Sequence, residues 1–591
     1  MAAGVLIPRC WRPGLAALSS LPLLQQFDYG DVVLSSEAHE KQLRETHSVL
    51  MGLSDDSLLK PLRQMSGLPA PGDDLGGWYH YDPEYKWGED SAGFAPSCTF
   101  GQWVSALARM YAITGDHATR EKVLRLNRLY AQTISGDYYE NNRFPTYCYD
   151  KIVCGLIDSY RYAGDGDAFS ILDRTTDTAL PHFPKHAVEH DTPWRANKDA
   201  SWTWDESYTI SENLFLAYQR GAGNRYRELG RQYLDDEYYD PLAEGRNVLA
   251  GCHAYSYVNS LSSAMQAYLT LGGEKYLRAA RNGFDMVAEQ SFATGGWGPD
   301  EQLRAPGSAD VYASLTDSHA SFETPCGSYA HFKLTRYLLR VTRESRYGDS
   351  MERVMYNTVL GAKPLMPDGR AFYYSDYNFK GHKFYREDQH WACCSGTLPQ
   401  VAADYRINTY FRDPQGVWVN LYIPSTLRWS QDGTHVALTQ KGEYPFDSLV
   451  QFDVQTTKAR DFTLSFRIPA WASGASISIN GRRASVPAVA GTFAAIHRRW
   501  KNRDRIELDL PMTTRLEPVD AEHPQTVALL FGPLVLFAVT ENSPVFSGSD
   551  LLAAKKISPR IWQAQTPNGP IKMLPFTDIA EEQYSTYLRL T

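Results

Sequence analysis

The chain has 591 residues, too many for one hydrophobic core, so its length predicts one large domain with one or two smaller ones. Hydrophobic residues make up 43% and charged residues 21%, a balance that excludes a disordered or fibrous chain. The formal net charge of -9, without a Lys/Arg-rich run, excludes nucleic acid as an expected partner. No apolar run reaches the roughly 20 residues that span a bilayer, so we expect no membrane partner.

The N-terminal segment, residues 1–40, leaves the compartment open between cytoplasm and periplasm. The stretch Leu15–Leu24 is apolar, but prolines interrupt it and no clean cleavage site follows, so it is a weak export signal. Eight cysteines in so long a chain do not form a disulfide framework, which favours reduced or metal-bound thiols. The DVVL stretch from Asp31 is typical of a short strand, and we expect it to pair with a β region later in the chain.

Residues 41–410 carry a repeat of two helices joined by a short turn that contains glycine. Apolar residues follow helical spacing in each copy, and the glycine falls where a left-handed C-cap is needed. A period of about 50 residues or more is typical of helix pairs that stack or form a ring. We predict a closed (α/α)6 helical barrel, with an open solenoid as the alternative. Five copies begin at Tyr111, Tyr160, Tyr218, Tyr268 and Tyr337, and a sixth has room between Thr46 and Arg63 or after Leu398.

Residues 411–591 contain short runs in which apolar and polar residues alternate. Examples are VWVNLYI from Val417, FTLSFRI from Phe462 and RIELDL from Arg505. Turn residues separate these runs at close spacing, which predicts one or more antiparallel β-sandwich domains. The predicted fold class is therefore multidomain α+β, with an (α/α)6 barrel followed by an antiparallel β-sandwich.

Three cysteines and one glutamate form the first candidate site. Cys393 and Cys394 are adjacent in WACCSG, and SFETPCGSY, about 70 residues earlier, supplies Glu323 and Cys326. Thiolates are soft donors that bind zinc, and three of them with a carboxylate complete a tetrahedral set. The alternative is that these cysteines are small buried apolar residues, since the CxxC pairs of ordinary zinc modules are missing.

A second candidate site is the glycine-rich TGGWGPDEQL loop, which contains Trp297, Asp300 and Glu301. Glycine lets the backbone approach a ligand, an indole can stack on a sugar, and a carboxyl with a raised pKa can act as a general acid. The alternative is an ordinary solvated loop.

Further polar residues could bind sugar hydroxyls or have only structural roles. His253 opens an apolar helix, and His319 stands four residues before Glu323. Glu212 lies near a helix start, where the helix dipole alone would explain a carboxylate. No phosphate loop, dinucleotide fingerprint or G-x-S-x-G elbow occurs, which excludes nucleotide-dependent and serine-hydrolase functions.

Several segments taken together resemble glycoside hydrolase family 127, the family of β-L-arabinofuranosidases and their relatives. The resemblance runs in order from about Asp28 to Ala538 and implies an (α/α)6 barrel followed by β-sandwich modules. The segments are YDKIVCGLIDSYRYAGD, GGWGPDE, FETPCGSYAHFKLTRYL, WACCSGTLPQVAADY, VNLYIPSTL, FRIPAWASGASISINGR and FGPLVLFA.

The resemblance also implies a mechanism. In that family a zinc-bound cysteine acts as nucleophile and a glutamate as general acid/base, so that a thioglycosyl intermediate gives retention. By position Cys393 is the nucleophile and Glu301 the acid/base, and His253 matches a histidine that contacts sugar hydroxyls. The implied zinc ligands are Glu323, Cys326, Cys393 and Cys394.

The chain departs from the family pattern at two places. Two residues separate Glu323 from Cys326 where the arabinofuranosidases have one, which puts the metal geometry in question. Asp150 and the pair Ile210–Ser211 stand where relatives often carry histidines, so a different sugar is a real alternative. The residues that we expect around the substrate are His253, Asp300, Trp297, Asp150, Glu212 and His319.

We therefore expect an exo-acting glycoside hydrolase that removes a terminal β-L-arabinofuranoside or a related plant-wall sugar. The expected partner is an oligosaccharide or glycoside. The sequence leaves open whether the chain forms a homo-oligomer. The alternatives are a sugar-acid lyase, isomerase or epimerase on the same barrel, and a non-catalytic glycan-binding protein.

Overall fold

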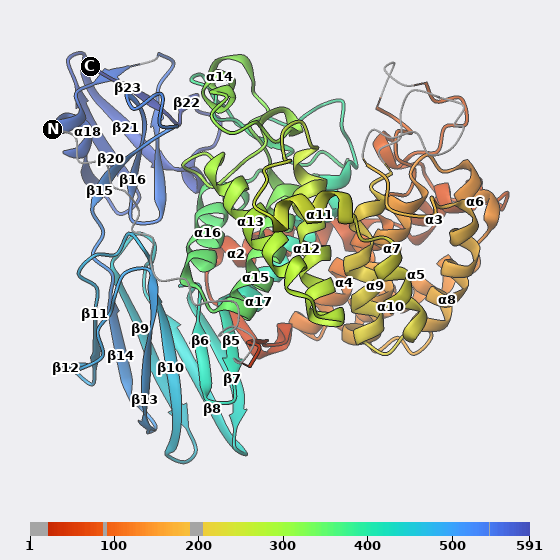
Figure 1. The fold of residues 1–591 in the computed structure, drawn as a ribbon, viewed down its shortest axis with the longest axis horizontal. Coiled ribbons are helices and arrows are strands. Elements are labelled where there is room, and N and C mark those ends of the chain that lie inside the picture. The colour runs from red at the N-terminus through yellow and green to blue at the C-terminus, as the bar shows by residue number, and fades with distance from the viewer. Residues whose placement is uncertain (1–21, 87–90, 190–204, 543) are drawn as a thin grey trace.

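The computed structural model describes residues 22–86, 91–189, 205–542 and 544–591 (Figure 1). Most of the apolar stretch Leu15–Leu24 lies outside these residues. Within them a helical domain stands beside β-rich modules, which confirms the multidomain α+β class. No helix in this part of the chain is long and apolar enough to cross a bilayer.

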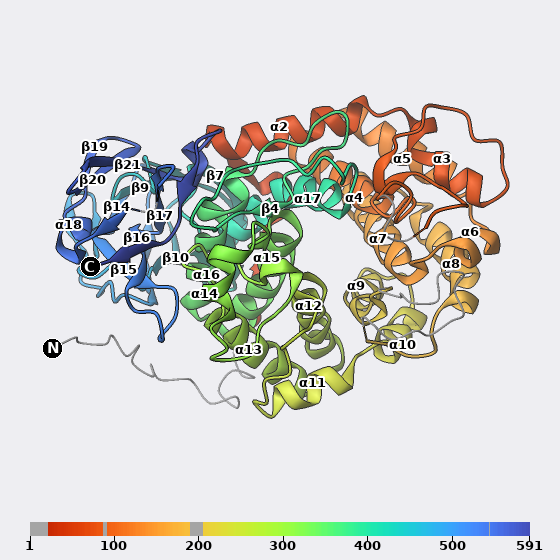
Figure 2. The ribbon, with the colours of Figure 1, turned by 90° about the horizontal axis from the view of Figure 1, so that it is seen from above.

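Six helices of the described residues form a closed inner ring (Figure 2). Each packs on the next in chain order, and the last packs back on the first. Neighbours cover these helices on most sides, so they are buried almost all round, as expected for helices inside a barrel. The inner helices are α4 (Phe100–Thr114), α7 (Pro145–Asp158), α9 (Ser211–Gln219), α12 (Ala254–Leu271), α15 (Thr324–Thr342) and α17 (Cys393–Thr409).

One outer helix packs against each inner helix, and α16 (Ser345–Asn357) also packs against the β modules. Five inner–outer pairs are the predicted hairpins, and Gly115 and Gly164 adopt the expected left-handed conformation, with φ of 69° and 65°. In order round the ring, the outer helices are α5 (His117–Tyr130), α8 (Ala168–Ala179), α10 (Asn224–Gln232), α13 (Glu274–Glu289), α16 (Ser345–Asn357) and α2 (Glu37–Gly52).

The sixth pair is not a hairpin, contrary to the expectation of a sixth contiguous copy. It joins α2, from the start of the domain, with α17, from its end. The ring closes in this way because the first outer helix and the last inner helix each lack a partner next to them in sequence. Four shorter helices lie in the connections: α3 (Asp55–Met65), α6 (Gly136–Asn141), α11 (Asp236–Ala243) and α14 (Asp310–Asp317).

A β-sandwich of two sheets follows the barrel, and both sheets include a strand from the N-terminal segment. Phe452 and Phe466 meet between the sheets, with ring centroids 5.0 Å apart. The DVVL stretch forms β2, which pairs with β7. One sheet has the order β1 (Gln25–Gln26), β5 (Tyr410–Asp413), β6 (Gly416–Val419), β10 (Arg460–Ile468), β13 (Thr492–Trp500). The other has the order β12 (Arg482–Arg483), β11 (Ser476–Ile479), β14 (Arg505–Asp509), β9 (Leu449–Thr456), β8 (Thr434–Lys441), β7 (Ser425–Gln431), β2 (Val32–Leu34).

The C-terminal residues form a third sheet, in which all pairs but β18·β23 are antiparallel. In the sandwich only β6·β10 is parallel. The main path of the third sheet is β18 (Val545–Phe546), β23 (Leu588–Leu590), β16 (Thr526–Phe531), β17 (Leu534–Val539), β21 (Gly569–Pro575), β20 (Ile561–Thr566), β19 (Lys555–Ser558). Beside it lie β15 (Thr514–Pro518), β22 (Tyr584–Ser585) and α18 (Gly548–Leu552).

A buried charge cluster joins the sandwich to the barrel. The guanidinium of Arg467, on β10, is fully buried and bonds to Glu352 at 2.7 Å and to Asp349, both on α16. Burial raises the pKa of Glu352, although Arg467 lowers it. Because these charges are removed from water, each depends on the others for compensation.

We predict that Arg467→Met destabilises the protein by about 3–5 kcal/mol, because it leaves the buried Glu352 carboxylate without its cation. Urea unfolding measures the change. The matched control is Arg499→Met, because Arg499 pairs with Asp461 on the surface with 65% of its side chain exposed, and a cost below about 1 kcal/mol is expected. Equal costs for the two variants would contradict the assignment.

Candidate active site

The amino-terminal ends of three inner helices bring the candidate residues to one mouth of the barrel. His253 is the N-cap of α12 and accepts from the backbone of Ser256, and Glu323 is the N-cap residue of α15. Cys393 and Cys394 are the first residues of α17. The positive ends of the helix dipoles therefore meet at this mouth, where they favour carboxylates and thiolates.

The three cysteines and the glutamate form one buried cluster, as the spacing argument required. The Cys326 and Cys394 sulfurs lie 3.5 Å apart, too far for a disulfide, which needs about 2.05 Å. Glu323 Oε1 is 3.3 Å from the Cys393 sulfur and 3.8 Å from that of Cys394. All four side chains offer one donor atom within 4.8 Å of the others.

The cluster fits a tetrahedral metal ion. Zinc–sulfur bonds of about 2.3 Å place two thiolates of a tetrahedron about 3.8 Å apart, close to the separations observed. Glu323 Oε2 is buried without a hydrogen-bond partner. Burial raises the pKa of Glu323 well above its usual range, and the neighbouring Cys393 and Glu301 raise it further. The four donors could therefore hold a metal ion at their centre.

The extra residue between Glu323 and Cys326 does not separate them. Glu323 is extended, with φ of -67° and ψ of 92°, and the helix starts immediately after it, with Pro325 in its first turn. Helical winding carries Cys326 back toward the carboxylate, so both side chains reach the cluster.

The thiol of Cys393 differs from its neighbours in its electrostatics. Burial would raise its pKa, but hydrogen bonds from Cys326, Cys394 and Tyr373 outweigh burial and hold the pKa of Cys393 well below the usual range. The pKa values of Cys326 and Cys394 are raised by burial. Cys393 is therefore the thiol of the cluster whose pKa is lowered, whereas the pKa values of its two neighbours are raised.

Glu301 lies beside this cluster. Its Oε2 is 3.3 Å from His253 Nε2, Tyr374 donates to its other oxygen, and one oxygen lies within 4.8 Å of a Glu323 oxygen. Burial raises the pKa of Glu301, but the contacts with His253 and Tyr374 outweigh it, so the net direction is down. Glu301 has φ of 58°, an unfavourable conformation for a non-glycine residue and one that often marks a functional site.

Sequence reasoning missed Glu206, which lies on the other side of His253. Its Oε1 is 3.8 Å from His253 Nδ1, and its Oε2 is buried without a partner. Burial raises the pKa of Glu206 to about 7, although His253 and Lys151 lower it. No motif marks Glu206; the signal is its left-handed backbone, with φ of 52°, which only the structure reveals.

Trp297 and Asp300 do not take the positions that the loop motif predicted. Trp297 is 1% exposed and its indole donates to His331, so the ring is packed inside the protein instead of lying open at the surface. Asp300 points outward, where it accepts from Ser318 at 2.6 Å and pairs with Arg304. The loop backbone lies close to its neighbours, since a Cβ at Gly298 would meet that of Ala254 at 2.3 Å.

Asp150 and Glu212 belong to ion pairs in the barrel wall. Asp150 bonds to Lys151 at 3.1 Å and to Asn213 at 2.7 Å. Glu212 pairs with Lys333, which lies ten residues beyond Glu323 on α15, about 15 Å along the helix axis. Glu212 is therefore held in an ion pair away from the thiol cluster, and a contact between Glu212 and the sugar stays a prediction.

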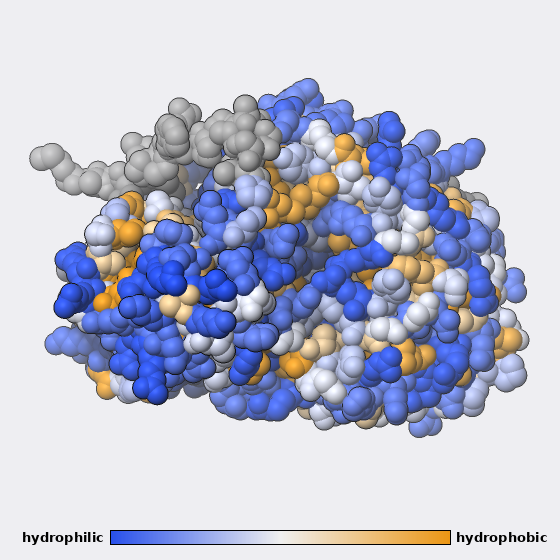
Figure 3. Space-filling model, turned by 90° about the horizontal axis from the view of Figure 1, so that it is seen from below, coloured by the Kyte–Doolittle hydropathy of each residue, from blue (hydrophilic) through white to orange (hydrophobic). Residues whose placement is uncertain are grey.

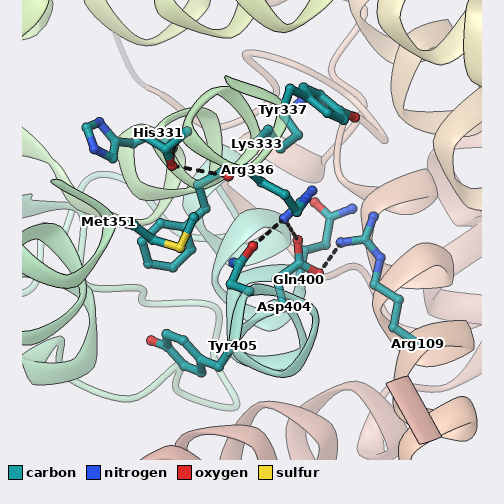
Figure 4. A network of polar contacts seen from close by, with 12 residues as sticks. Arg109, His331, Lys333, Arg336, Tyr337, Met351, Gln400, Asp404 and Tyr405 are labelled. Atoms are coloured by element: carbon teal, nitrogen blue, oxygen red, sulfur yellow. Dashed lines mark hydrogen bonds and ion pairs between the residues drawn. The ribbon is translucent and has the colours of Figure 1, made fainter. Parts of the chain in front are cut away.

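A charged network fills the barrel below the cluster (Figure 4). Arg109 and Arg336 both bond to Asp404, at 2.9 and 3.3 Å. A cavity of about 450 Å³ lies at this far end, where Leu24 bonds to the backbone of Arg340 and the N-terminal segment partly covers the opening. Seen from below, the molecular surface is mostly hydrophilic with small scattered apolar groups (Figure 3).

His319 lies at the surface with half of its side chain exposed. It bonds to Asp376 at 2.8 Å and does not touch the thiol cluster. The structure thus brings together Cys393, Glu301, Glu323, Cys326, Cys394 and His253.

Comparison with known proteins agrees with this geometry. The family model "Beta-L-arabinofuranosidase, GH127 catalytic domain" matches residues 31–406, and "Beta-L-arabinofuranosidase, GH127 middle domain" matches 416–512. No curated protein sequence matches the chain.

Solved structures share the fold. A GH127 β-L-arabinofuranosidase from Geobacillus stearothermophilus T6 is 17% identical over 95% of this chain and 100% of its own, with a TM-score of 0.71. The GH127 β-arabinofuranosidase BT3674 is 17% identical over 96% of this chain and 98% of its own, with a TM-score of 0.72.

The protein is thus a glycoside hydrolase built on a helical barrel with appended β modules. The two family matches span most of its length, and the chain belongs to glycoside hydrolase family 127.

We predict that the purified protein binds one zinc ion in the thiol cluster and that Cys394→Ser abolishes this binding, because three donors hold zinc far less tightly than four. Cobalt is the spectroscopic probe, since a cobalt–thiolate pair absorbs in the near ultraviolet. Cys148→Ser is the control, because Cys148 is buried outside the cluster. An unchanged cobalt–thiolate band in Cys394→Ser would rule out this site.

Proposed function

We propose that this enzyme is an exo-acting, retaining glycosidase that removes a terminal β-L-arabinofuranosyl unit or a sugar of related shape. The observation that carries the proposal is that Glu323 lies between two groups at one mouth of the barrel: it bonds to the buried thiol of Cys393, and it lies within 4.8 Å of the Glu301–His253 pair. The choice of sugar is supported by the solved structures with the same fold, a GH127 β-L-arabinofuranosidase and a GH127 β-arabinofuranosidase.

In the first step the Cys393 sulfur attacks the anomeric carbon, so that a carbon–sulfur bond forms as the glycosidic carbon–oxygen bond breaks. Glu301 delivers a proton to the leaving oxygen and is left as a carboxylate, which His253, at 3.3 Å, stabilises. In the second step Glu301 takes a proton from water, whose oxygen displaces the sulfur from carbon. Two displacements on one carbon retain its configuration.

Glu323, Cys326, Cys393 and Cys394 are the residues that would hold a zinc ion. When bound, the ion would hold Cys393 as a thiolate by lowering its pKa further. Helix N-termini at the same mouth favour that negative charge.

Polar groups without partners supply hydrogen bonds for the sugar hydroxyls. In the described part of the chain, Glu206 Oε2, the Tyr255 hydroxyl and the Gln102 amide are buried without partners. Tyr255 follows His253 on α12, and Gln102 packs on Gly396 in the first turn of α17. The bonds of Arg109 and Arg336 to Asp404 cross the barrel interior below the cluster, which supports cleavage at a chain end.

Hydrolysis is favoured over a sugar-acid lyase, isomerase or epimerase, because the enzyme belongs to a family of glycoside hydrolases. Mass analysis of the products separates these functions, since hydrolysis adds one water and the alternatives do not. The same family membership argues against a glycan-binding protein without activity.

We predict that Cys393→Ser and Glu301→Gln each lower kcat by a factor of about 10³ or more on a β-L-arabinofuranoside with a poor leaving group. An aryl glycoside separates the roles: its leaving group needs no proton, so its first step survives in Glu301→Gln but not in Cys393→Ser. Glu289→Gln, an exposed change on α13, is the control and should keep wild-type activity. Wild-type turnover in Cys393→Ser would refute the mechanism.

A second prediction concerns Glu206. We expect Glu206→Gln to lower kcat/KM about 10- to 100-fold while zinc binding is unchanged, because the carboxylate positions His253 and lies outside the thiol cluster. Steady-state kinetics with zinc analysis measures both effects. Loss of zinc in this variant would instead indicate that Glu206 supports the metal site.

A further inference from the structure

A second group of possible metal ligands lies apart from the thiol cluster. His319, Asp376 and His382 each offer one donor atom within 4.8 Å of the others. His319 stands just before β3 (Phe322–Glu323), and Asp376 directly follows β4 (Tyr374–Ser375). These short strands pair, so two segments about 55 residues apart in sequence place their side chains together.

The donor atoms already have a spacing close to that of a metal site. Asp376 Oδ2 lies 2.8 Å from His319 Nδ1 and 3.3 Å from His382 Nδ1. Zinc bonds of about 2.0–2.1 Å to nitrogen and oxygen place tetrahedral ligands about 3.3 Å apart, so an ion fits with small side-chain adjustments. One carboxylate oxygen faces both imidazoles.

The carboxylate is held in place by its own backbone contacts. Asp376 is fully buried, and it accepts from the backbone amides of Asn378 at 2.9 Å and His382 at 3.0 Å. A buried oxygen anchored in this way is typical of a metal ligand with an ordered surrounding.

The two imidazoles leave the site open to solvent. The side chains of His319 and His382 are 50% and 48% exposed, so an ion can enter from water and keep a water molecule as fourth ligand. Two imidazoles and one carboxylate suit zinc and neighbouring divalent transition metals better than magnesium or calcium, which prefer oxygen ligands.

From this geometry we infer a second metal site, in which His319, Asp376 and His382 bind a zinc-like divalent ion. The ion joins the segment that leads into Glu323 with the segment that follows Tyr374, the hydrogen-bond donor to Glu301. It therefore clamps two loops that carry active-site residues. The site shares no ligand with the thiol cluster, so it does not depend on the proposed mechanism.

The test uses the full chain without a histidine tag, stripped of metal and titrated with zinc chloride by calorimetry and with cobalt chloride by absorption. We expect the double variant H319A/H382A to lose one equivalent of bound metal relative to wild type and to keep the cobalt–thiolate band. Cys394→Ser should show the reverse, so the two sites fail independently. The control is His497→Ala, because His497 lies on β13 in the sandwich, and it should bind as wild type does.

Asp376→Asn provides a second variant if the double variant folds poorly, because it keeps the side-chain shape and removes the charge. It should lose the same equivalent of zinc, and with it the zinc-dependent rise in Tm that this site contributes. The inference would be overturned if both variants bound as much metal as wild type. In that case the two imidazoles would only form hydrogen bonds with Asp376.

Discussion

The closed ring of six inner helices is the constraint on which the active site depends. The amino-terminal ends of α12, α15 and α17 meet at one mouth, so their dipoles and first-turn side chains converge on one small volume. A shift of any one helix by a turn, about 5.4 Å, would take its residue out of reach. The outer helices and the β modules hold this ring in place.

The mouth concentrates groups that are unfavourable when buried together. Glu206, Glu301, Glu323 and Cys393 all become anionic if they ionise, while His253 is a cationic partner within a few ångströms of two of them. Burial without compensation would cost several kcal/mol per charge. A cation in the thiol cluster would relieve this repulsion, so the electrostatics and the donor geometry both favour the proposed metal site.

Charge compensation recurs at other levels of the structure. The network of Arg109, Arg336 and Asp404 neutralises the barrel interior below the site, and Arg467 neutralises acidic groups of α16 at the sandwich interface. The second metal site extends this pattern to the loops at the mouth. Pairs of buried opposite charges thus hold together the domain interface, the barrel wall and the active-site loops.

The sequence by itself determined the five hairpins, the β-rich second half and the four members of the thiol cluster, because helical periodicity, strand alternation and rare cysteines are local signals. The tertiary structure alone decided that α2 completes the ring with α17, since two distant helices leave no pattern between them. It also decided that Trp297 is buried, that Glu206 lies beside His253 and that Glu212 pairs with a lysine. Whether such a residue faces a pocket, the core or an ion pair depends on helix rotation and on partners from distant segments, which composition and spacing do not encode.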